Sequence, residues 1–73
     1  MEPGRYKFIS TDQMYDVFQD TVTEREGKTK KAIKHWFAQP LDSQGNKEGQ
    51  RFPITKVVWD WEKKLKYGGI IKV

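Results

Sequence analysis

The chain has 73 residues, of which 14 are Lys or Arg and 10 are Asp or Glu, so its formal net charge is +4 at neutral pH. The absence of Cys excludes a disulfide scaffold and a thiolate zinc site, and no apolar run approaches the roughly 18 residues of a membrane-spanning helix. Because only 36% of the residues are hydrophobic, the three Trp, three Tyr and four Phe must supply much of the core. We expect a single domain over residues 1–73 in a reducing, cytoplasmic setting.

A short strand is predicted over residues 5–9, where Tyr6 and Phe8 alternate with Arg5 and Lys7. The strand ends at Ser10, which resembles the first residue of a capping box because Gln13 follows three positions later. A first helix is therefore predicted to start at Thr11 and to fade near Gly27. Its apolar side follows helical spacing and consists of Met14, Val17, Phe18 and Val22.

A second helix is predicted over residues 29–39, before Pro40. In helical projection its apolar residues occupy one side and its lysines the other: Ala32, Ile33, Trp36 and Phe37 against Lys30, Lys31 and Lys34. The rival interpretation is a hairpin that turns at Gly27. Strand alternation would place Lys31 on the same face as Phe37, which separates the two sets less well, so the pattern favours the helix.

Residues 40–50 are rich in turn-forming residues and are predicted to form a long exposed loop. A third helix follows, with Thr55 as a plausible cap, Trp61 on its core side and Gly68 at its C-terminal stop. Residues 70–73 are suited to pairing with the strand at 5–9. The predicted fold class is α+β, with two to three helices and short N- and C-terminal strands.

The net charge divides unevenly, because residues 1–26 carry −3 and residues 27–73 carry +7. On the predicted first helix, like charges repeat every four residues and repel one another. Two interpretations stay open: a partner inside the molecule, most simply the lysine face of the second helix, or a docking face for a basic protein. The residues of this candidate acidic docking face are Asp12, Asp16, Asp20 and Glu24.

The lysines at and near the predicted second helix lie where its dipole disfavours cations, so local stability does not explain them. They form either a solvated face or a patch that contacts phosphate or an acidic protein. His35 beside them is predicted to be a surface or a hydrogen-bonded side chain, and not a metal ligand or a general base. Trp59 lies off the apolar arc of the third helix and is either covered by neighbouring segments or exposed as an aromatic contact. Trp36 and Trp61 are predicted to be core residues.

Two groups of cations complete the candidate surface. Arg5 and Lys7 point outward from an edge strand, where charge either blocks unwanted pairing or extends a basic surface. Arg51 and Arg5 are the side chains best able to hold carboxylate or phosphate at two points. The candidate partner-binding residues are Arg5, Lys7, Lys28, Lys30, Lys31, Lys34, Arg51, Trp59 and Lys63.

No catalytic pattern is present in the sequence. Ser10 is assigned to a cap, Ser43 lies in the predicted loop, and His35 has no orienting acid nearby. The Gly-containing loop lacks the spacing of a phosphate-binding loop. We therefore expect a protein that is not an enzyme and holds no cofactor or metal.

A short, Cys-free, Lys- and Trp-rich chain with a divided charge and a segment such as Lys34, His35, Trp36, Phe37 resembles the small lytic-phage proteins that bind host RNA polymerase. The resemblance concerns size and composition along the whole chain and implies a role in transcription regulation in the host cytoplasm. We expect a monomeric regulatory protein that binds a larger machine, most simply RNA polymerase, and no membrane. The alternative is direct DNA or RNA binding by a helix-turn-helix or winged domain that uses the lysine-rich second helix.

Overall fold

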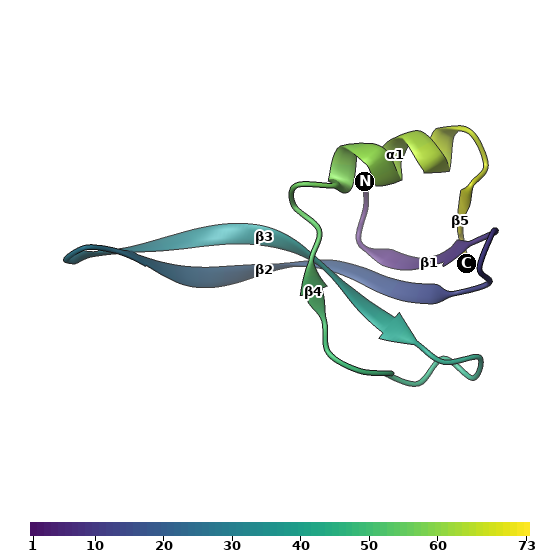
Figure 1. The fold of residues 1–73 in the computed structure, drawn as a ribbon, viewed down its shortest axis with the longest axis horizontal. Helices are drawn as coiled ribbons and strands as arrows, with labels where there is room; N and C mark the ends of the chain where they lie inside the picture. The colour runs from purple at the N-terminus through teal and green to yellow at the C-terminus, as the bar shows by residue number, and fades with distance from the viewer.

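The computed structural model describes residues 1–73 and consists of one sheet and one helix. The five strands form a single antiparallel sheet in the order β4-β3-β2-β1-β5 (Figure 1). The elements are β1 (Gly4–Phe8), β2 (Met14–Glu26), β3 (Thr29–Leu41), β4 (Phe52–Pro53), α1 (Val58–Lys66) and β5 (Ile70–Lys72).

The predicted first and second helices are wrong, and with them the expectation of two to three helices. Their residues form β2 and β3, so no helix-turn-helix or winged framework is present. Residues Val17, Phe18 and Val22 satisfy a helical period, but in the strand Val17 faces one side of the sheet and the other two face the opposite side. Because the sheet is covered on both faces near its centre, the alternation that identifies a strand is blurred there. The many β-branched and aromatic residues of β2 favour the strand.

The strand also removes the repulsion that a helix would have imposed on the acidic row. Residues four apart in a helix are neighbours, whereas in a strand they lie about 13 Å apart at about 3.3 Å per residue. Asp16 and Asp20 thus occupy the same face without contact between their carboxylates. The regular four-residue spacing that looked costly in a helix is tolerated in β2.

The turn at Gly27, which belonged to the rival interpretation, is confirmed. Glu26 and Thr29 form the last pair of β2 and β3, which leaves Gly27 and Lys28 as a two-residue loop. Gly27 has a φ of 58° and Lys28 has no positive φ, as in a type II′ hairpin turn with Gly first. This turn matches the twist of the two strands and fixes their register.

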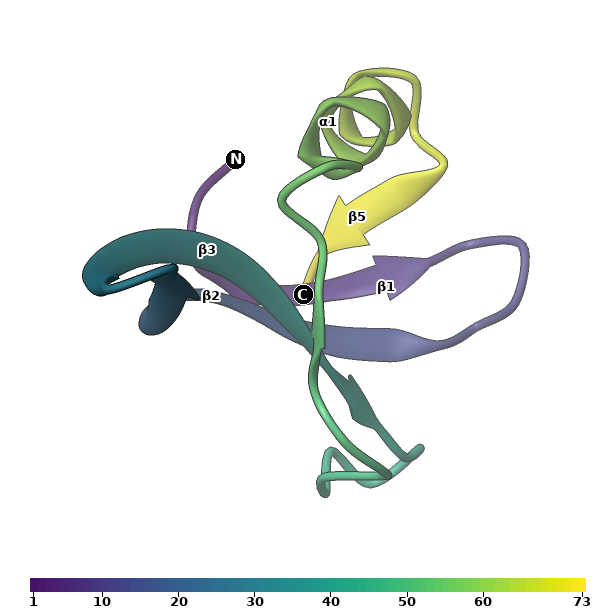
Figure 2. The same ribbon diagram turned by 60° about the vertical axis from the view of Figure 1, so that its left-hand side comes forward.

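The core lies between α1 and one face of the sheet, called here the helix-side face (Figure 2). Tyr6, Val17 and Ala38 contribute from the three central strands, and each is at most 2% exposed. Trp61 of α1 packs on them, as predicted for a core residue. Ile54 and Ile70 complete the set of fully enclosed aliphatic side chains. Trp36 is only half-buried and packs at the edge of this core.

Predictions for the two ends of the chain hold better than those for its middle. The N-terminal strand is present as β1, and β5 pairs with it as expected, with Phe8 opposite Ile70. The prediction that this strand lies at an edge is wrong, because β1 lies between β2 and β5. The third predicted helix is α1, and Gly68 follows it with a φ of 82°. The predicted cap is wrong, because α1 has no side-chain cap and the Thr55 hydroxyl instead accepts the Trp36 N–H at 3.0 Å.

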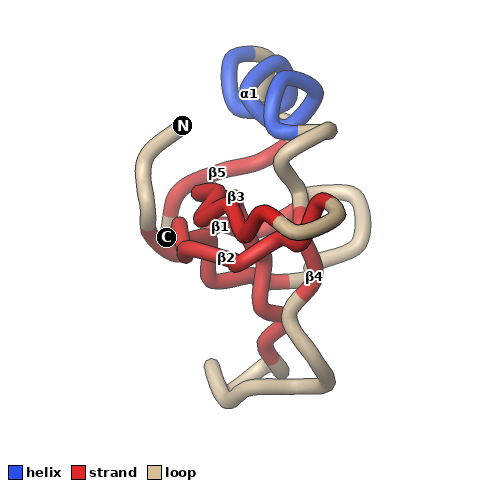
Figure 3. The backbone as a smooth tube through the Cα atoms, turned by 90° about the vertical axis from the view of Figure 1, so that its left-hand side faces the viewer, coloured by secondary structure: helices blue, strands red, loops and turns tan.

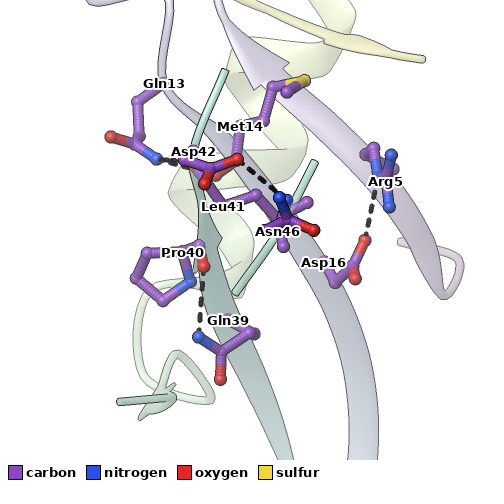
Figure 4. Close-up of polar contacts among 9 residues, drawn as sticks. All are labelled: Arg5, Gln13, Met14, Asp16, Gln39, Pro40, Leu41, Asp42 and Asn46. Atoms are coloured by element: carbon purple, nitrogen blue, oxygen red, sulfur yellow. Dashed lines mark hydrogen bonds and ion pairs between the residues drawn. The ribbon is translucent and has the colours of Figure 1, made fainter. Parts of the chain in front are cut away.

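The loop over residues 42–51 lies on the other face of the sheet, away from α1 (Figure 3). The buried Gln39 amide donates to the Gly49 carbonyl oxygen at 3.0 Å, and Leu41 bridges to Lys47. Asp42 accepts the Asn46 N–H at 2.9 Å and so closes a tight turn (Figure 4). The loop is exposed, as predicted, but Pro40 belongs to β3.

Candidate functional site

The β2 and β3 strands continue as a two-stranded ribbon far beyond the rest of the sheet (Figure 1). β1 pairs with β2 only as far as Val17, and β4 pairs with β3 only from Phe37. Residues 19–36, called here the arm, therefore have no third strand, and none of them is buried. The arm gives the molecule extents of 44 × 26 × 16 Å.

Because successive side chains of a strand point to opposite faces, the charged residues of the arm divide between its two faces. Three cross-strand pairs of the arm continue the helix-side face outward: Thr21 with Lys34, Thr23 with Ala32, and Arg25 with Lys30. That face of the arm has no carboxylate, and all of its cations are exposed. Together with the turn residue at the tip, they form what we call the cationic face: Arg25, Lys28, Lys30 and Lys34.

Two members of the cationic face oppose each other directly. Arg25 and Lys30 are cross-strand partners, so their Cβ atoms lie about 5 Å apart. Like charges in this position destabilise a sheet. None of the six ion pairs of the molecule includes a member of the cationic face. The charge arrangement therefore opposes folding of the arm, and no ion pair within the chain offsets it.

The acidic row, in contrast, is matched residue by residue within the molecule. Asp12 pairs with Lys7 at 2.7 Å and Asp16 with Arg5 at 3.2 Å, the second shown in Figure 4. The remaining pairs are Asp20 with Arg51 and Glu24 with His35. An internal partner was one of the two interpretations of this row, but the partner expected, the lysine set at 28–34, supplies none of the pairs.

Asp20 is the carboxylate held most strongly. Arg51 Nη1 donates to Asp20 Oδ2 at 2.6 Å, and the Thr21 N–H donates to Oδ1 at 2.9 Å. The Arg51 hydrogen bond, the Thr21 N–H and the Arg51 charge lower the pKa of Asp20 below its ordinary value. The Arg51 guanidinium also lies 4.3 Å from the Phe37 ring centroid. Arg51 thus links the loop to the base of the arm.

His35 provides a second link at the base of the arm, and both of its ring nitrogens have hydrogen-bond partners. Nε2 lies 3.0 Å from Glu24 Oε1 and Nδ1 lies 3.0 Å from the Thr55 hydroxyl. Thr55 also bonds to the Trp36 backbone, so this contact ties β3 to the segment that leads into α1. The arrangement agrees with the predicted structural role of His35, but the expectation that no acid lies beside it is wrong, because Glu24 contacts its ring.

The structure divides the predicted partner-binding residues into three groups and leaves Lys31 apart from them. Lys28, Lys30 and Lys34 come together on the cationic face, whereas Lys31 lies on the opposite face of the arm across from Glu24. The second group is engaged in internal ion pairs and consists of Arg5, Lys7 and Arg51. The third group, Trp59 and Lys63, is on the outer surface of α1.

Arg25 is the functional candidate that the sequence analysis missed. The sequence pattern placed Arg25 near the end of the predicted first helix, so nothing connected it with the lysines at 28–34. A hairpin that turns at Gly27 pairs residue 25 with residue 30 and would have identified Arg25 as part of the same face.

The outer surface of α1 presents exposed aromatics beside lysines. Trp59 is 66% exposed and Tyr67 79% exposed, and Lys63 Nζ lies 5.6 Å from the Trp59 ring centroid. Trp59 is therefore not covered by neighbouring segments, which answers the question that the sequence left open. The lysines in the last turn of α1 also favour its dipole, so folding accounts for them in part.

No three His, Asp or Glu side chains gather in a way that could hold a metal ion, and no helix is long and apolar enough to cross a membrane. Comparisons with protein-family models, with curated proteins and with solved structures find nothing that matches this chain.

Proposed function

We propose that this protein is a non-enzymatic regulatory protein that binds a larger macromolecular machine, with the cationic face of the arm as its principal contact. The transcription machinery is the machine that we propose, in the cytoplasm of the host cell. The size, the composition and the divided charge of the chain support this choice, since they resemble those of small phage proteins that bind RNA polymerase.

The observation that carries the proposal is that the cations of the cationic face form no ion pair within the molecule. The fold gives each carboxylate of the acidic row a partner, a cation for three of them and the His35 ring for Glu24, but leaves four cations together on a ribbon without a core. Isolated two-stranded hairpins are marginally stable in water, and the pair Arg25 with Lys30 reduces that stability further. A polyanionic partner would offset this repulsion, and the protruding shape lets the arm reach into a recess of a larger body.

The acidic row is a weaker candidate for a docking face. A basic partner would have to displace the internal cations, including Arg51 from Asp20 at 2.6 Å and Lys7 from Asp12 at 2.7 Å. Breaking such pairs offsets what the new contacts provide. We therefore assign the partner contact to the arm and a structural role to the row.

Binding to a purified bacterial RNA polymerase core enzyme, measured for the enzyme alone and for the enzyme assembled on a DNA template, tests this function. The wild-type chain is compared with the triple variant Lys28→Glu, Lys30→Glu, Lys34→Glu and with a matched variant that reverses Lys47, Lys64 and Lys66, three exposed lysines outside the arm. We expect the arm variant to lose at least ten-fold in affinity and the matched variant to lose much less. Equal losses, or no binding by the wild type, contradict the proposal.

A further inference from the structure

We propose that the cationic face of the arm binds the phosphate backbone of duplex DNA, with the ribbon lying in the major groove. This inference rests on the proposed function and names the chemistry that the arm contacts within a larger machine. It requires no rearrangement of the fold, because the cationic face is exposed and free of internal ion pairs.

The composition of the cationic face favours phosphate over a protein surface. Between its cations lie only small side chains, Thr21, Thr23 and Ala32. Protein interfaces depend on aromatic and apolar anchors and are depleted in Lys. Phosphate contacts need only cations and hydroxyl donors, which is what this face offers. The two most exposed aromatics of the molecule are instead Trp59 on α1 and Tyr67 directly after it.

The same composition favours a duplex over a single strand. Proteins that bind single strands provide aromatic side chains on which the bases stack. The only aromatic residue on this face of the arm is Trp36 at its base, and it is half-buried against the core. The outer part of the cationic face, from Lys34 to Lys28, therefore offers charge without a stacking platform.

The dimensions of the arm suit the major groove of B-form DNA. That groove is about 12 Å wide and admits a two-stranded ribbon, whereas the major groove of duplex RNA is too narrow for side chains to enter. Arg25 comes from β2, and Lys30 and Lys34 from β3, so both strands of the ribbon carry cations. From Lys34 to the tip they extend over about 20 Å at about 3.3 Å per residue. The long side chains can then reach phosphates on both sides of the groove.

The chemistry predicts binding with little sequence preference. Lysine ammonium groups act as point charges on phosphate, and only Arg25 could contact a base at two points. With four phosphates neutralised, the logarithm of the binding constant should fall against the logarithm of salt concentration with a slope of about −3.6. Between 50 and 200 mM salt the affinity should fall about 150-fold.

Fluorescence anisotropy with a labelled 20-base-pair duplex of mixed sequence measures this slope. Two double variants remove the same charge: Lys30→Gln with Lys34→Gln on the cationic face, and Lys31→Gln with Lys47→Gln outside it. Lys30 and Lys31 are adjacent residues of one strand on opposite faces, which makes the second variant a close control. We expect a slope near −1.8 for the first variant and near −3.6 for the second.

Backbone amide shifts of the wild-type chain, titrated with the same duplex, provide a measurement that depends on no variant. We expect the perturbed amides to lie in residues 19–36. A spread over α1 and the loop would overturn the assignment, and so would equal slopes for the two variants. Tighter binding to a single strand of equal length would overturn the choice of duplex.

Absence of duplex binding at 50 mM salt rejects this inference. If the arm-dependent affinity for RNA polymerase core enzyme persists in that case, the proposed function stands with a protein surface as the partner. If both are absent, the proposed function fails as well.

Discussion

Asp20 shows how single residues tie the base of the arm to the body of the fold. Its carboxylate accepts from Arg51 of the loop and from the adjacent Thr21 N–H, and both contacts lower its pKa. Arg51 is in turn stacked on Phe37. The carboxylate therefore acts as a structural anchor between the loop and β2, although it lies on the surface.

The lowered pKa of Asp20 predicts a pH-dependent contribution to stability. A carboxyl with a folded-state pKa below its unfolded-state pKa stabilises the fold above the unfolded value, near pH 4, and loses this effect as the pH falls through the folded value. Asp20→Asn should therefore lower the urea midpoint at pH 7 and leave it nearly unchanged at pH 2. Trp fluorescence during urea titration measures both midpoints.

Glu48→Gln is the control for this prediction, because Glu48 is exposed and forms no ion pair. It should leave the midpoint unchanged at both pH values. A loss of the same size at pH 7 and pH 2 for Asp20→Asn would show that charge is not the cause.

At the scale of elements, the arm is the least stabilised part of the fold. Its strands have no third neighbour and no buried side chain, and beyond Trp36 at its base its only half-buried apolar side chains are the cross-strand partners Val22 and Ile33. Segments with few buried contacts open locally, at a lower free energy than the whole molecule. The arm is therefore expected to exchange its amide hydrogens while the body of the sheet stays closed.

Gly27→Ala tests this local opening. The φ of 58° at Gly27 disfavours any residue with a Cβ by about 1 kcal/mol, although the new Cβ would meet no neighbour within 4 Å. We expect exchange in the arm to rise about five-fold, with no change at Tyr6 or Ala38. Hydrogen-exchange NMR measures both.

Gly49→Ala is the matched control for this variant, since Gly49 has a φ of 74° and equally open surroundings but lies in the loop. It should leave exchange in the arm unchanged. Faster exchange throughout the sheet in Gly27→Ala would show instead that the arm and the body open together.

The elements differ in how far local pattern specifies them. β1, α1 and β5 can be predicted because each has one buried face and a clear stop, such as Gly68. β2 and β3 could not, because near Val17 and Phe18 both faces of the sheet are covered, which mimics a helical period. The strand propensity of Thr21, Val22 and Thr23 was the signal that should have outweighed it.

The candidate site was predictable in composition but not in geometry. The lysines at 28–34 stand out by charge alone, and their lack of a folding role is evident from the sequence. Which of them share a face depends on the register with β2, which places Lys30 beside Arg25 and separates Lys31 from both. The internal pairs of the acidic row join residues up to 31 positions apart, which no local pattern reveals.

At the scale of the whole molecule, the arm makes the fold unusually extended. The radius of gyration over Cα atoms is 13.9 Å, against about 11 Å for a compact chain of this length. All nine buried residues lie outside residues 19–36. The arm therefore contributes little to the core of the fold.

Removal of the outer arm should leave a folded body. Residues 21–34 can be replaced by an Asn-Gly turn that joins Asp20 to His35, which are cross-strand partners. We expect this shortened chain to unfold cooperatively in urea and to have a radius of gyration of about 10.5 Å, measured by small-angle X-ray scattering. Loss of near-ultraviolet circular dichroism in the shortened chain would show that the arm is needed for folding.

The missing third strand along the arm has a consequence for solubility. Beyond Val17 and Phe37, β2 and β3 each present an edge of backbone donors and acceptors that no neighbouring strand covers. Such edges can pair with strands of other molecules, and lysine side chains at an edge disfavour this intermolecular pairing. The lysines of the arm therefore also keep copies of the protein apart in concentrated solution. Acetylation or any other neutralisation of them would lower the barrier to edge-to-edge aggregation.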